Sequence, residues 1–151
     1  MFIGKVCNRD VAIVDQDDSL KEAAEVMRAQ HVGSVVVVQK ARGGVKPVGI
    51  LTDRDIVVEI LASGVAMDAV AVKDVMSRDL LAAREDSDLF DVIERIRDKG
   101  VRRVPVVDGK GLLVGIASTD DLISLLAQTF SDLVSLIDRQ QRRERKRRPA
   151  K

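Results

Sequence analysis

The chain has 151 residues, enough for one domain or two very small ones and for a sizeable core. It carries 25 Lys and Arg against 24 Asp and Glu, a net charge of +1, with 46% hydrophobic residues, which excludes wholesale disorder and a uniformly basic nucleic-acid binder. It has no Trp or Tyr and only three Phe, which disfavours surfaces that stack bases on aromatic rings.

The single cysteine and the single histidine limit the chemistry further. Cys7 alone excludes an intrachain disulfide framework, and His31 alone leaves no zinc site of the usual Cys/His kind. No window approaches the ~18 apolar residues of a transmembrane helix, and segment 1–10 has too few consecutive apolar residues for a signal peptide. We therefore expect a soluble protein of the cytoplasm, with no metal and no membrane association.

The two halves of the chain resemble each other. Segment 6–10 matches segment 75–79 at an offset of 69 residues, and no gap is needed for about thirty residues beyond it. Farther on, Gly49 falls on Gly115 at an offset of 66, so the first copy carries three extra residues within 39–48. The extra length lies in a glycine-containing turn, where insertions cost little.

In chain order, the first copy is expected to form a strand, a helix, two strands and a second helix. An apolar run at 11–14 predicts a short strand, and Ser19 begins a helix through a capping-box pattern. The β-branched run at 34–38 predicts a strand buried on both faces, paired in a hairpin with 48–51. The second helix then begins after Thr52.

The second copy repeats this order. Its first helix has apolar residues at the helical spacing from Leu89 to Ile96, and its hairpin strands are expected at 104–107 and 112–117. Pro105 stands inside the first of these strands, which favours an edge position or a bulge there.

The last helix is longer than its counterpart in the first copy. Apolar residues recur every three or four positions to Ile137, a stripe longer than one small module needs, so we expect part of it to pack on something else. We expect a helical extension at 129–141 and a basic, disordered tail at 142–151. From Arg139 onward the net charge is +7, which leaves −6 for residues 1–138.

The segments 49–56 and 115–122 share a motif. Both read Gly-apolar-x-Thr/Ser-x-x-Asp-apolar, and both lie where a strand is expected to lead into a helix. For one copy alone, the hydroxyl and the acid three residues later are explained equally well as a helix cap. Alternatively, the N–H groups at the beginning of the helix bind a phosphate while the carboxylate accepts ribose hydroxyls. The sequence leaves both interpretations open.

The duplicated unit, the repeated openings at 6–10 and 75–79 and the repeated motif resemble a tandem pair of CBS domains, also called a Bateman module. The resemblance covers about residues 3–128 and extends to the regulatory insert of IMP dehydrogenase and to stand-alone prokaryotic CBS pairs. It implies an α/β (α+β) fold of two βαββα units, 3–66 and 70–128, related by a pseudo-twofold axis. It also implies two clefts for adenosine-containing ligands such as AMP, ADP, ATP or S-adenosylmethionine.

The same resemblance suggests the residues that bind such a ligand. Asp55 and Asp121 match the ribose-binding acids of the family, and Thr52 and Ser118 match its phosphate or ribose contacts. Arg102 and Arg103 match positions where some members bind phosphate, with Arg103 favoured. The alternative that both arginines only solvate the end of a strand stays open.

The first copy departs from this pattern. It has Gly33 and Ser34 where the second copy has the two arginines, so we expect unequal sites, with one phosphate-binding cleft rather than two. His31 is a weaker candidate phosphate ligand, more simply explained as the end of a helix, and Arg54 fits a phosphate contact or a solvated side chain equally well.

Together these patterns predict a non-enzymatic regulatory or energy-sensing module with no obligatory cofactor and no catalytic residues. The surplus apolar stripe predicts a homodimer, and a sensor of this kind needs a protein effector that the sequence does not identify. The alternative is a nucleic-acid-associated protein that acts through its basic C-terminal residues. An enzyme has the least support, because nothing pairs convincingly as a nucleophile and a base.

Overall fold

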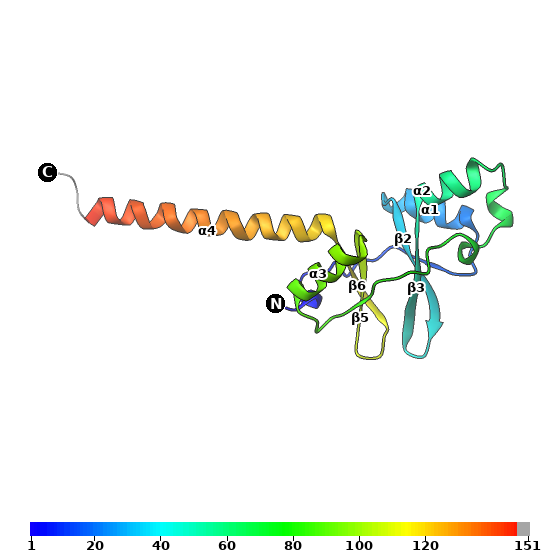
Figure 1. Cartoon of the computed structure of the whole chain (residues 1–151), viewed down its shortest axis with the longest axis horizontal. Coiled ribbons are helices and arrows are strands. Elements are labelled where there is room, and N and C mark those ends of the chain that lie inside the picture. The colour runs from blue at the N-terminus through cyan, green and yellow to red at the C-terminus, as the bar shows by residue number, and fades with distance from the viewer. Residues whose placement is uncertain (148–151) are drawn as a thin grey trace. The chain divides into compact units, whose positions relative to one another are not determined.

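The structure is a computed structural model that describes residues 1–147 (Figure 1). The chain divides into two compact units, residues 1–118 and residues 119 onward, the second formed by one helix. The strands are β1 (Ile13–Asp15), β2 (Ser34–Ala41), β3 (Gly44–Thr52), β4 (Ala83–Arg84), β5 (Arg103–Val107) and β6 (Leu113–Ser118). The helices are α1 (Leu20–Gln30), α2 (Asp53–Asp55), the π-helical η2 (Ile56–Leu61) that continues α2, α3 (Leu89–Lys99) and α4 (Thr119–Arg147).

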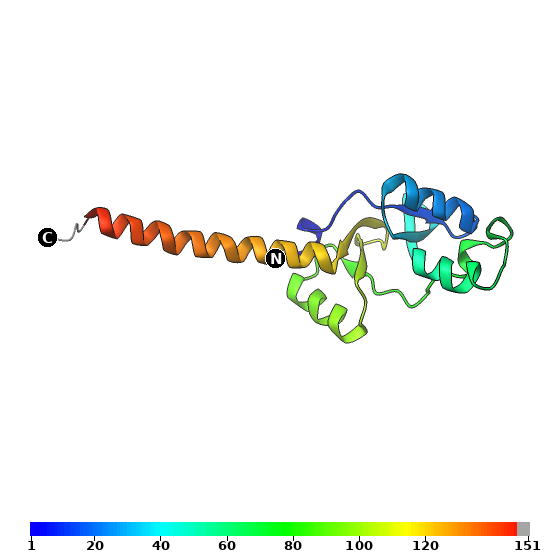
Figure 2. The ribbon, with the colours of Figure 1, turned by 90° about the horizontal axis from the view of Figure 1, so that it is seen from above.

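The first unit contains two three-stranded sheets with the same topology. In each, a short strand pairs in parallel with the middle strand, and the middle strand pairs antiparallel with the next, in the orders β1-β2-β3 and β4-β5-β6. Seen from above, α1 and the α2–η2 helix lie together by the first sheet and α3 lies by the second (Figure 2). The predicted duplication and the mixed α+β fold are confirmed.

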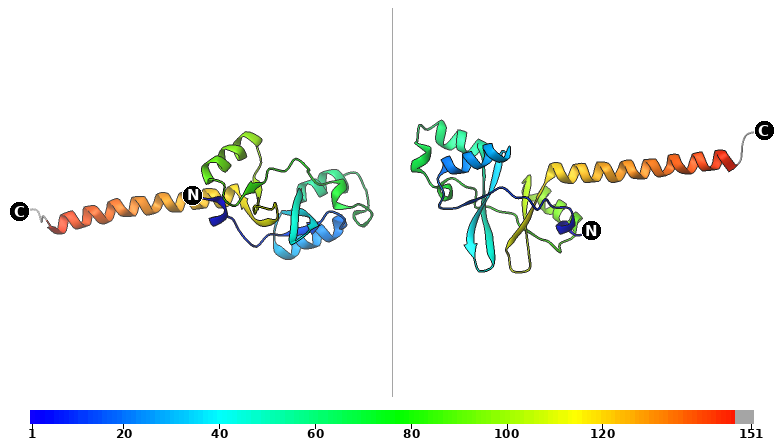
Figure 3. Two further views of the ribbon diagram at one scale, coloured as in Figure 1. Left: turned by 90° about the horizontal axis from the view of Figure 1, so that it is seen from below. Right: turned by 180° about the vertical axis from the view of Figure 1, so that it is seen from behind.

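The two hairpins, β2–β3 and β5–β6, lie side by side in the views of Figures 1 and 3, with β3 and β6 in contact. Each carries a register shift at the same place, between Val37 and Val38 in the first copy and between Val106 and Val107 in the second. The copies therefore agree even in the irregularities of their strands.

The opening segments of the two copies, which lead into their first strands, are exchanged between them. Ser77, which leads into the second copy, exchanges two backbone hydrogen bonds with Ile50 of β3, at 2.9 and 3.1 Å. Asn8, which leads into the first copy, does the same with Ile116 of β6, at 2.8 and 2.9 Å. Each copy thus completes its fold with backbone from the other, and the exchange follows the pseudo-twofold relation between them.

The core of the first copy shows the same exchange. Val35 and Val37 of β2 are buried together with Leu51 of β3, as the unbroken β-branched run predicts. Val72 and Met76, which belong to the opening segment of the second copy, are buried in this cluster too. The hydrophobic surface of one copy is therefore covered partly by residues from the other side of the repeat.

Pro105 lies in the middle strand β5, so the predicted edge position is wrong, whereas the predicted alternative of a bulge agrees with the register shift between Val106 and Val107. At the equivalent position in the first copy, Val36 donates its N–H to the carbonyl of Ala12 at 2.9 Å, and β1 pairs over three residues. Proline has no N–H, and β4 pairs over only two residues, beginning at Ala83 and Val106. The missing donor thus accounts for the shorter strand in the second copy.

The C-terminal helix is longer than expected. A disordered tail was predicted from residue 142, whereas α4 continues without a break to Arg147, and residues 148–151 lie outside the described part of the chain. Arg, Lys and Gln favour helices, Gln140 bonds to Glu144 one turn later, and cations suit the negative end of the helix dipole. Charge alone was a poor indicator of disorder here.

Candidate functional site

A pocket of about 260 Å³ lies inside the first unit, between the end of β3 and the beginning of the second copy. Its apolar walls come from Ile50 of β3, from Leu80 and Leu81 before β4, and from Val101 after α3. Its polar lining residues are Thr52, Ser77, Asp79, Arg102 and Arg103. The exchange of the lead-in segment places residues 77–81 beside β3, so both copies of the repeat build this site.

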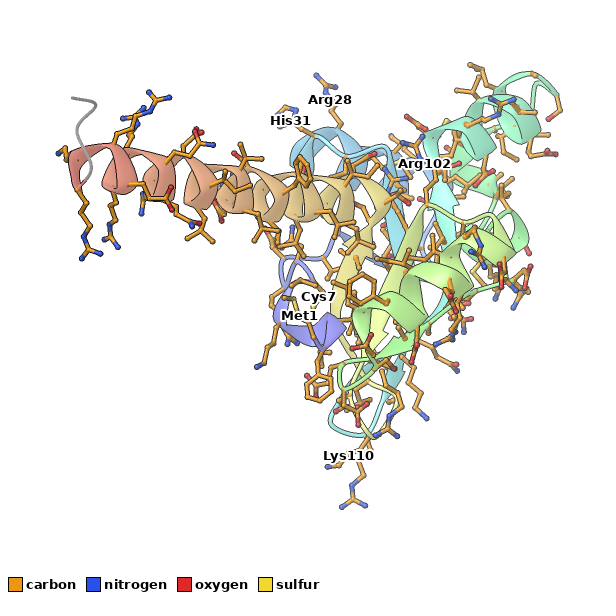
Figure 4. The ribbon with its side chains drawn as sticks, turned by 60° about the vertical axis from the view of Figure 1, so that its left-hand side comes forward. Met1, Cys7, Arg28, His31, Arg102 and Lys110 are labelled. Atoms are coloured by element: carbon orange, nitrogen blue, oxygen red, sulfur yellow. The ribbon has the colours of Figure 1, made fainter. Side chains whose placement is uncertain are left out.

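The charge of this pocket is set by Arg102, which is labelled in Figure 4, and by Arg103 at the beginning of β5. Asp79, which also lines the pocket, forms an ion pair with Lys99 at the end of α3. The lining thus carries two guanidinium groups and one carboxylate, a net positive charge. Guanidinium groups suit a phosphate, which accepts two parallel hydrogen bonds from one arginine.

Thr52 and Asp55 form the reciprocal cap that the motif allows. The Asp55 carboxylate accepts from the Thr52 backbone N–H at 2.9 Å, and the Thr52 hydroxyl accepts from the Asp55 N–H at 3.1 Å. The next two N–H groups are engaged as well, Asp53 with the Gly33 carbonyl and Arg54 with the Asp53 carboxylate. In this copy the cap is therefore made, and the first N–H groups of the helix already have protein partners.

Only one of the two residues of this cap lines the pocket. Thr52 lines it together with the two arginines, whereas Asp55 lines a second hollow of about 350 Å³ with Glu59, Asp74 and Ser77. Three carboxylates there oppose a phosphate. The predicted ribose role of Asp55 stays a prediction, and the hollow itself favours no anion.

The second copy of the motif begins at the end of β6. Ser118 pairs directly with Arg103 across the strands β5 and β6, as Ser34 pairs with Thr52 in the first copy. Asp121 lies in the first turn of α4, which belongs to the other unit. The ligand roles of Ser118 and Asp121 therefore remain predictions, with Ser118 next to an arginine that lines the pocket.

His31 and Arg54 do not line this pocket. His31 ends α1 in the left-handed conformation, with φ of 55°, and Gly100 ends α3 in the same way at φ of 68°. Figure 4 shows the exposed His31 side chain beside Arg28 and directed away from the fold. The helix-end interpretation of His31 accounts for this geometry, and Arg54 is an exposed residue of α2.

Cys7 is placed as a packing residue. Its Sγ lies where a side chain on Gly115 would begin, 2.6 Å from the position of an added Cβ. Burial raises the pKa of the Cys7 thiol, with Arg9 opposing that effect. A protonated, partly buried thiol is a poor nucleophile, and Cys7 aligns with the apolar Met76 at the offset of 69 residues, so both observations favour packing over reactivity.

Several pocket residues were missed by sequence reasoning. Ser77 and Asp79 belong to the repeated opening that was used only to align the copies, and Leu80, Leu81 and Val101 were not singled out. The available signal was Ser-Arg-Asp at 77–79, which matches Asn-Arg-Asp at 8–10. It did not show that this opening packs on the opposite copy.

Two further observations narrow the chemistry. Within residues 1–147, no cluster of three or more His, Cys, Asp and Glu side chains is arranged to hold a metal ion. In the same part of the chain, no helix combines the length and the apolarity that a bilayer span requires.

The sequence model of the CBS domain matches this chain twice, at residues 3–62 and 72–128. The chain belongs to the CBS domain family. The two matches coincide with the two copies of the repeat, and the structure is that of a CBS pair.

Relatives of known sequence agree with this assignment. The chain is 34% identical over 123 residues to an uncharacterized protein of Methanopyrus kandleri, which covers 82% of this chain and 61% of that protein. It is 36% identical over 112 residues to a CBS domain-containing protein of Bacillus subtilis, 74% of this chain and 76% of the relative. It is 32% identical over 119 residues to inosine-5′-monophosphate dehydrogenase of Methanocaldococcus jannaschii, 79% of this chain and 22% of the enzyme.

Solved structures show the same fold. The CBS domain pair of protein MJ0100, crystallised with 5′-methylthioadenosine and S-adenosyl-L-methionine, superimposes with a TM-score of 0.71 and 24% identity, covering 85% of this chain and 98% of that one. An uncharacterized conserved protein from Pyrococcus horikoshii gives a TM-score of 0.68 with 27% identity, covering 82% and 90%. The architecture of a CBS pair is therefore shared across these proteins.

Proposed function

We propose that this CBS pair is a regulatory module that binds an adenosine-containing ligand in the pocket between β3 and the beginning of the second copy. The observation that carries the proposal is the composition of that pocket, in which an apolar wall faces Thr52, Arg102 and Arg103. The apolar residues suit an adenine ring, and the arginines suit a phosphate. AMP, ADP and ATP fit this combination, and S-adenosylmethionine remains an alternative without a phosphate.

A relative of the same fold supports the choice of ligand class. The MJ0100 pair was crystallised with two adenosine compounds, which indicates that this architecture can hold such molecules. In the present chain the phosphate-binding part of the proposal rests on Arg102 and Arg103.

The proposal assigns binding and no reaction. The pocket lining contains no His, Cys or Lys, and the carboxylate in it is the ion-paired Asp79. A nucleophile with an adjacent base is therefore missing from the residues that line it. In the cytoplasm, where we place the protein, a module of this kind senses the energy state by ligand occupancy and passes it to a protein effector through the geometry of a homodimer.

Isothermal titration calorimetry on the full chain tests this proposal. Adenosine, AMP, ADP, ATP and S-adenosylmethionine are titrated into the wild type, into Arg103→Gln and into Lys110→Gln, a matched control at the exposed tip of the same hairpin. We expect a phosphate-containing ligand to bind the wild type and the control alike and to bind Arg103→Gln at least tenfold more weakly. Absence of binding by all five compounds at millimolar concentration would overturn the proposal.

The second candidate function is nucleic-acid association through the C-terminal half of α4. Six basic residues against one acid occupy 139–147, and all are exposed on a continuous helix. Their contact with phosphates would weaken as the salt concentration rises. Electrophoretic mobility shifts with DNA and RNA at two salt concentrations, with and without residues 139–151, distinguish this function from ligand sensing.

A further inference from the structure

The helix α4 presents a regular apolar seam to solvent. Its apolar residues alternate at intervals of three and four over two heptads, and each is between 43% and 69% exposed. They are Ile123, Leu126, Phe130, Leu133 and Ile137. This 3-4-3-4 spacing is the a and d pattern of a coiled coil, so the seam is suited to another helix.

The size of the seam explains why it requires a partner. From Ile123 to Ile137 it extends about 21 Å at 1.5 Å per residue. Val134 and Leu136 flank it and are 45% and 62% exposed, which widens the apolar face. A contiguous apolar face of this extent is rare on the surface of a monomer and indicates an interaction site.

Charge along the same helix identifies the partner and its direction. Residues 119–138 contain four acids and no base, a charge of −4, whereas residues 139–147 contain six bases and one acid, a charge of +5. Two such helices in parallel bring the two basic ends together and repel. In antiparallel orientation each basic end lies beside the acidic half of its neighbour.

We propose that α4 pairs in antiparallel orientation with α4 of a second copy of this chain. In an antiparallel pair, each a residue of one helix packs beside a d residue of the other, and this requirement sets the register. In that register Leu126 faces Ile137 of the second copy, and Phe130 faces Leu133. The same register lays residues 139–144 of each helix, which contain three bases and one acid, alongside residues 119–124 of the second copy, which contain two acids and no base. Apolar spacing and charge distribution thus select the same arrangement.

The helix dipole alone does not account for this pattern. Acids at the beginning and bases at the end of a helix stabilise a lone helix, which explains the order of the charges. It does not explain the exposed a and d residues, because a lone helix gains nothing from an apolar seam in water. The second copy explains both features.

Light scattering coupled to gel filtration tests the surface. Phe130→Glu places a charge in the middle of the seam, and Ser135→Glu places the same charge on the opposite face as the matched control. We expect the mass of Phe130→Glu to be half that of the wild type, while Ser135→Glu keeps the wild-type mass. A wild type that is already monomeric, or a Phe130→Glu variant that keeps the wild-type mass, overturns the proposal.

Disulfide trapping tests the direction. In a Cys7→Ser background, differently tagged Leu126→Cys and Ile137→Cys chains are refolded together and oxidised. The antiparallel pair predicts a mixed disulfide between the two tags and little disulfide when Leu126→Cys is oxidised alone. The reverse outcome indicates a parallel pair and overturns the proposal.

The basic end gives a last discriminating measurement. If residues 139–147 serve the α4 pair, the wild-type oligomer persists when DNA or RNA is added and neither nucleic acid is bound at physiological salt. Dissociation of the oligomer by either nucleic acid indicates that the basic end serves a different partner, and that outcome overturns the proposal.

Discussion

Where the strand after its first helix begins, the second copy of the repeat has Arg102 and Arg103, and the first copy has Gly33 and Ser34. The strand order, the register shifts and the left-handed helix ends agree in the two copies. Backbone architecture was therefore kept while the chemistry at one strand end diverged. Under the proposed function, the duplicated fold offers two equivalent places for a ligand, and the side chains at this strand end decide which of them is used.

The surroundings of Gly33 strengthen this contrast. A side chain added at Gly33 would meet the carboxylate of Asp53 at 3.0 Å, and the Gly33 carbonyl accepts the Asp53 N–H. The first copy thus holds an acid close to the position where the second copy has Arg102. Under the proposed function, this difference in charge disfavours an anionic ligand at the first position and favours one at the second.

The two copies also differ in the residue that fills the core. The test of this difference has the largest expected effect. Leu51 is fully buried in the first copy, whereas the equivalent residue of the second copy is the fully buried Ala117. Leu51→Ala is expected to lower the free energy of unfolding by about 2–5 kcal/mol, because it removes a buried side chain and leaves a cavity. Urea unfolding measures this loss in free energy, and Val58→Ala is the control.

Val58 is 52% exposed in η2, so its truncation is expected to change the free energy of unfolding by about 0.5 kcal/mol or less. Equal losses in Leu51→Ala and Val58→Ala would show that the core of the first copy does not depend on Leu51.

The proposed difference in ligand binding between the two copies can be tested by giving the second copy the residues of the first. A variant with both Arg102→Gly and Arg103→Ser is expected to lose at least tenfold in affinity for AMP, because each hydrogen bond to a charged group contributes about 1.5–3 kcal/mol. Its affinity for adenosine is expected to stay the same, since adenosine has no phosphate. Calorimetry with AMP and with adenosine measures the two affinities in the variant and in the wild type.

A parallel loss for adenosine and AMP would indicate that the double variant damages the pocket rather than its charge. Thermal unfolding of the same variant shows whether the fold is intact, and Lys110→Ser controls for the loss of a positive charge outside the pocket.

How much of this comparison could be predicted from the sequence depends on how local the signal is. The duplication, the hairpins and the cap at Ser19 were predicted, because each depends on neighbouring residues or on a fixed offset. The exchange of the lead-in segments was not predicted, since no pattern in residues 70–79 indicates which copy they pack on. The pocket lining at 77–81 was missed for the same reason.

The candidate site was predicted in part for a related reason. Thr52, Arg102 and Arg103 do line one pocket, although they are about fifty residues apart in the chain. Asp55 was expected beside Thr52, but its carboxylate caps the helix and lines the acidic hollow. The carboxylate of the motif can cap a helix or bind a ribose, and the sequence pattern is the same in both cases. Only the tertiary structure shows where the carboxylate lies.

The exchange of lead-in segments can be tested at the glycines that permit it. A Cβ on Gly49 would lie 2.7 Å from the carbonyl oxygen of Ser77, and a Cβ on Gly115 would lie 2.9 Å from that of Asn8. Gly49→Ala and Gly115→Ala are each expected to lower the free energy of unfolding by about 1–3 kcal/mol, because backbone must move to make room.

Gly109→Ala is the control, since no atom lies within 4 Å of an added Cβ there. Urea unfolding of the three variants compares the copies directly. A loss at only one of Gly49 and Gly115 would show that the exchange is tighter on one side of the repeat than on the other.

The smallest expected effect concerns the helix caps that begin α1 and α3. Ser19 caps α1 with a neutral hydroxyl, whereas the equivalent Asp88 caps α3 and forms an ion pair with the N-terminal amine of Met1 at 2.9 Å. The hydrogen bond from that amine lowers the pKa of Asp88, and the Phe90 N–H lowers it further. The stabilisation is present above the ordinary carboxyl pKa of about 3.9 and is lost as the pH falls through the lowered pKa.

Asp88→Asn keeps an oxygen for the cap but loses the charge, so its melting temperature should lie slightly below that of the wild type at pH 7 and converge with it toward pH 3. Ser19→Ala removes a neutral hydroxyl that caps α1 and that also helps to lower the pKa of Glu22, so only part of its deficit should be lost over the same range. A deficit in Asp88→Asn that does not change with pH would mean that the amine contributes nothing and that the two caps work alike.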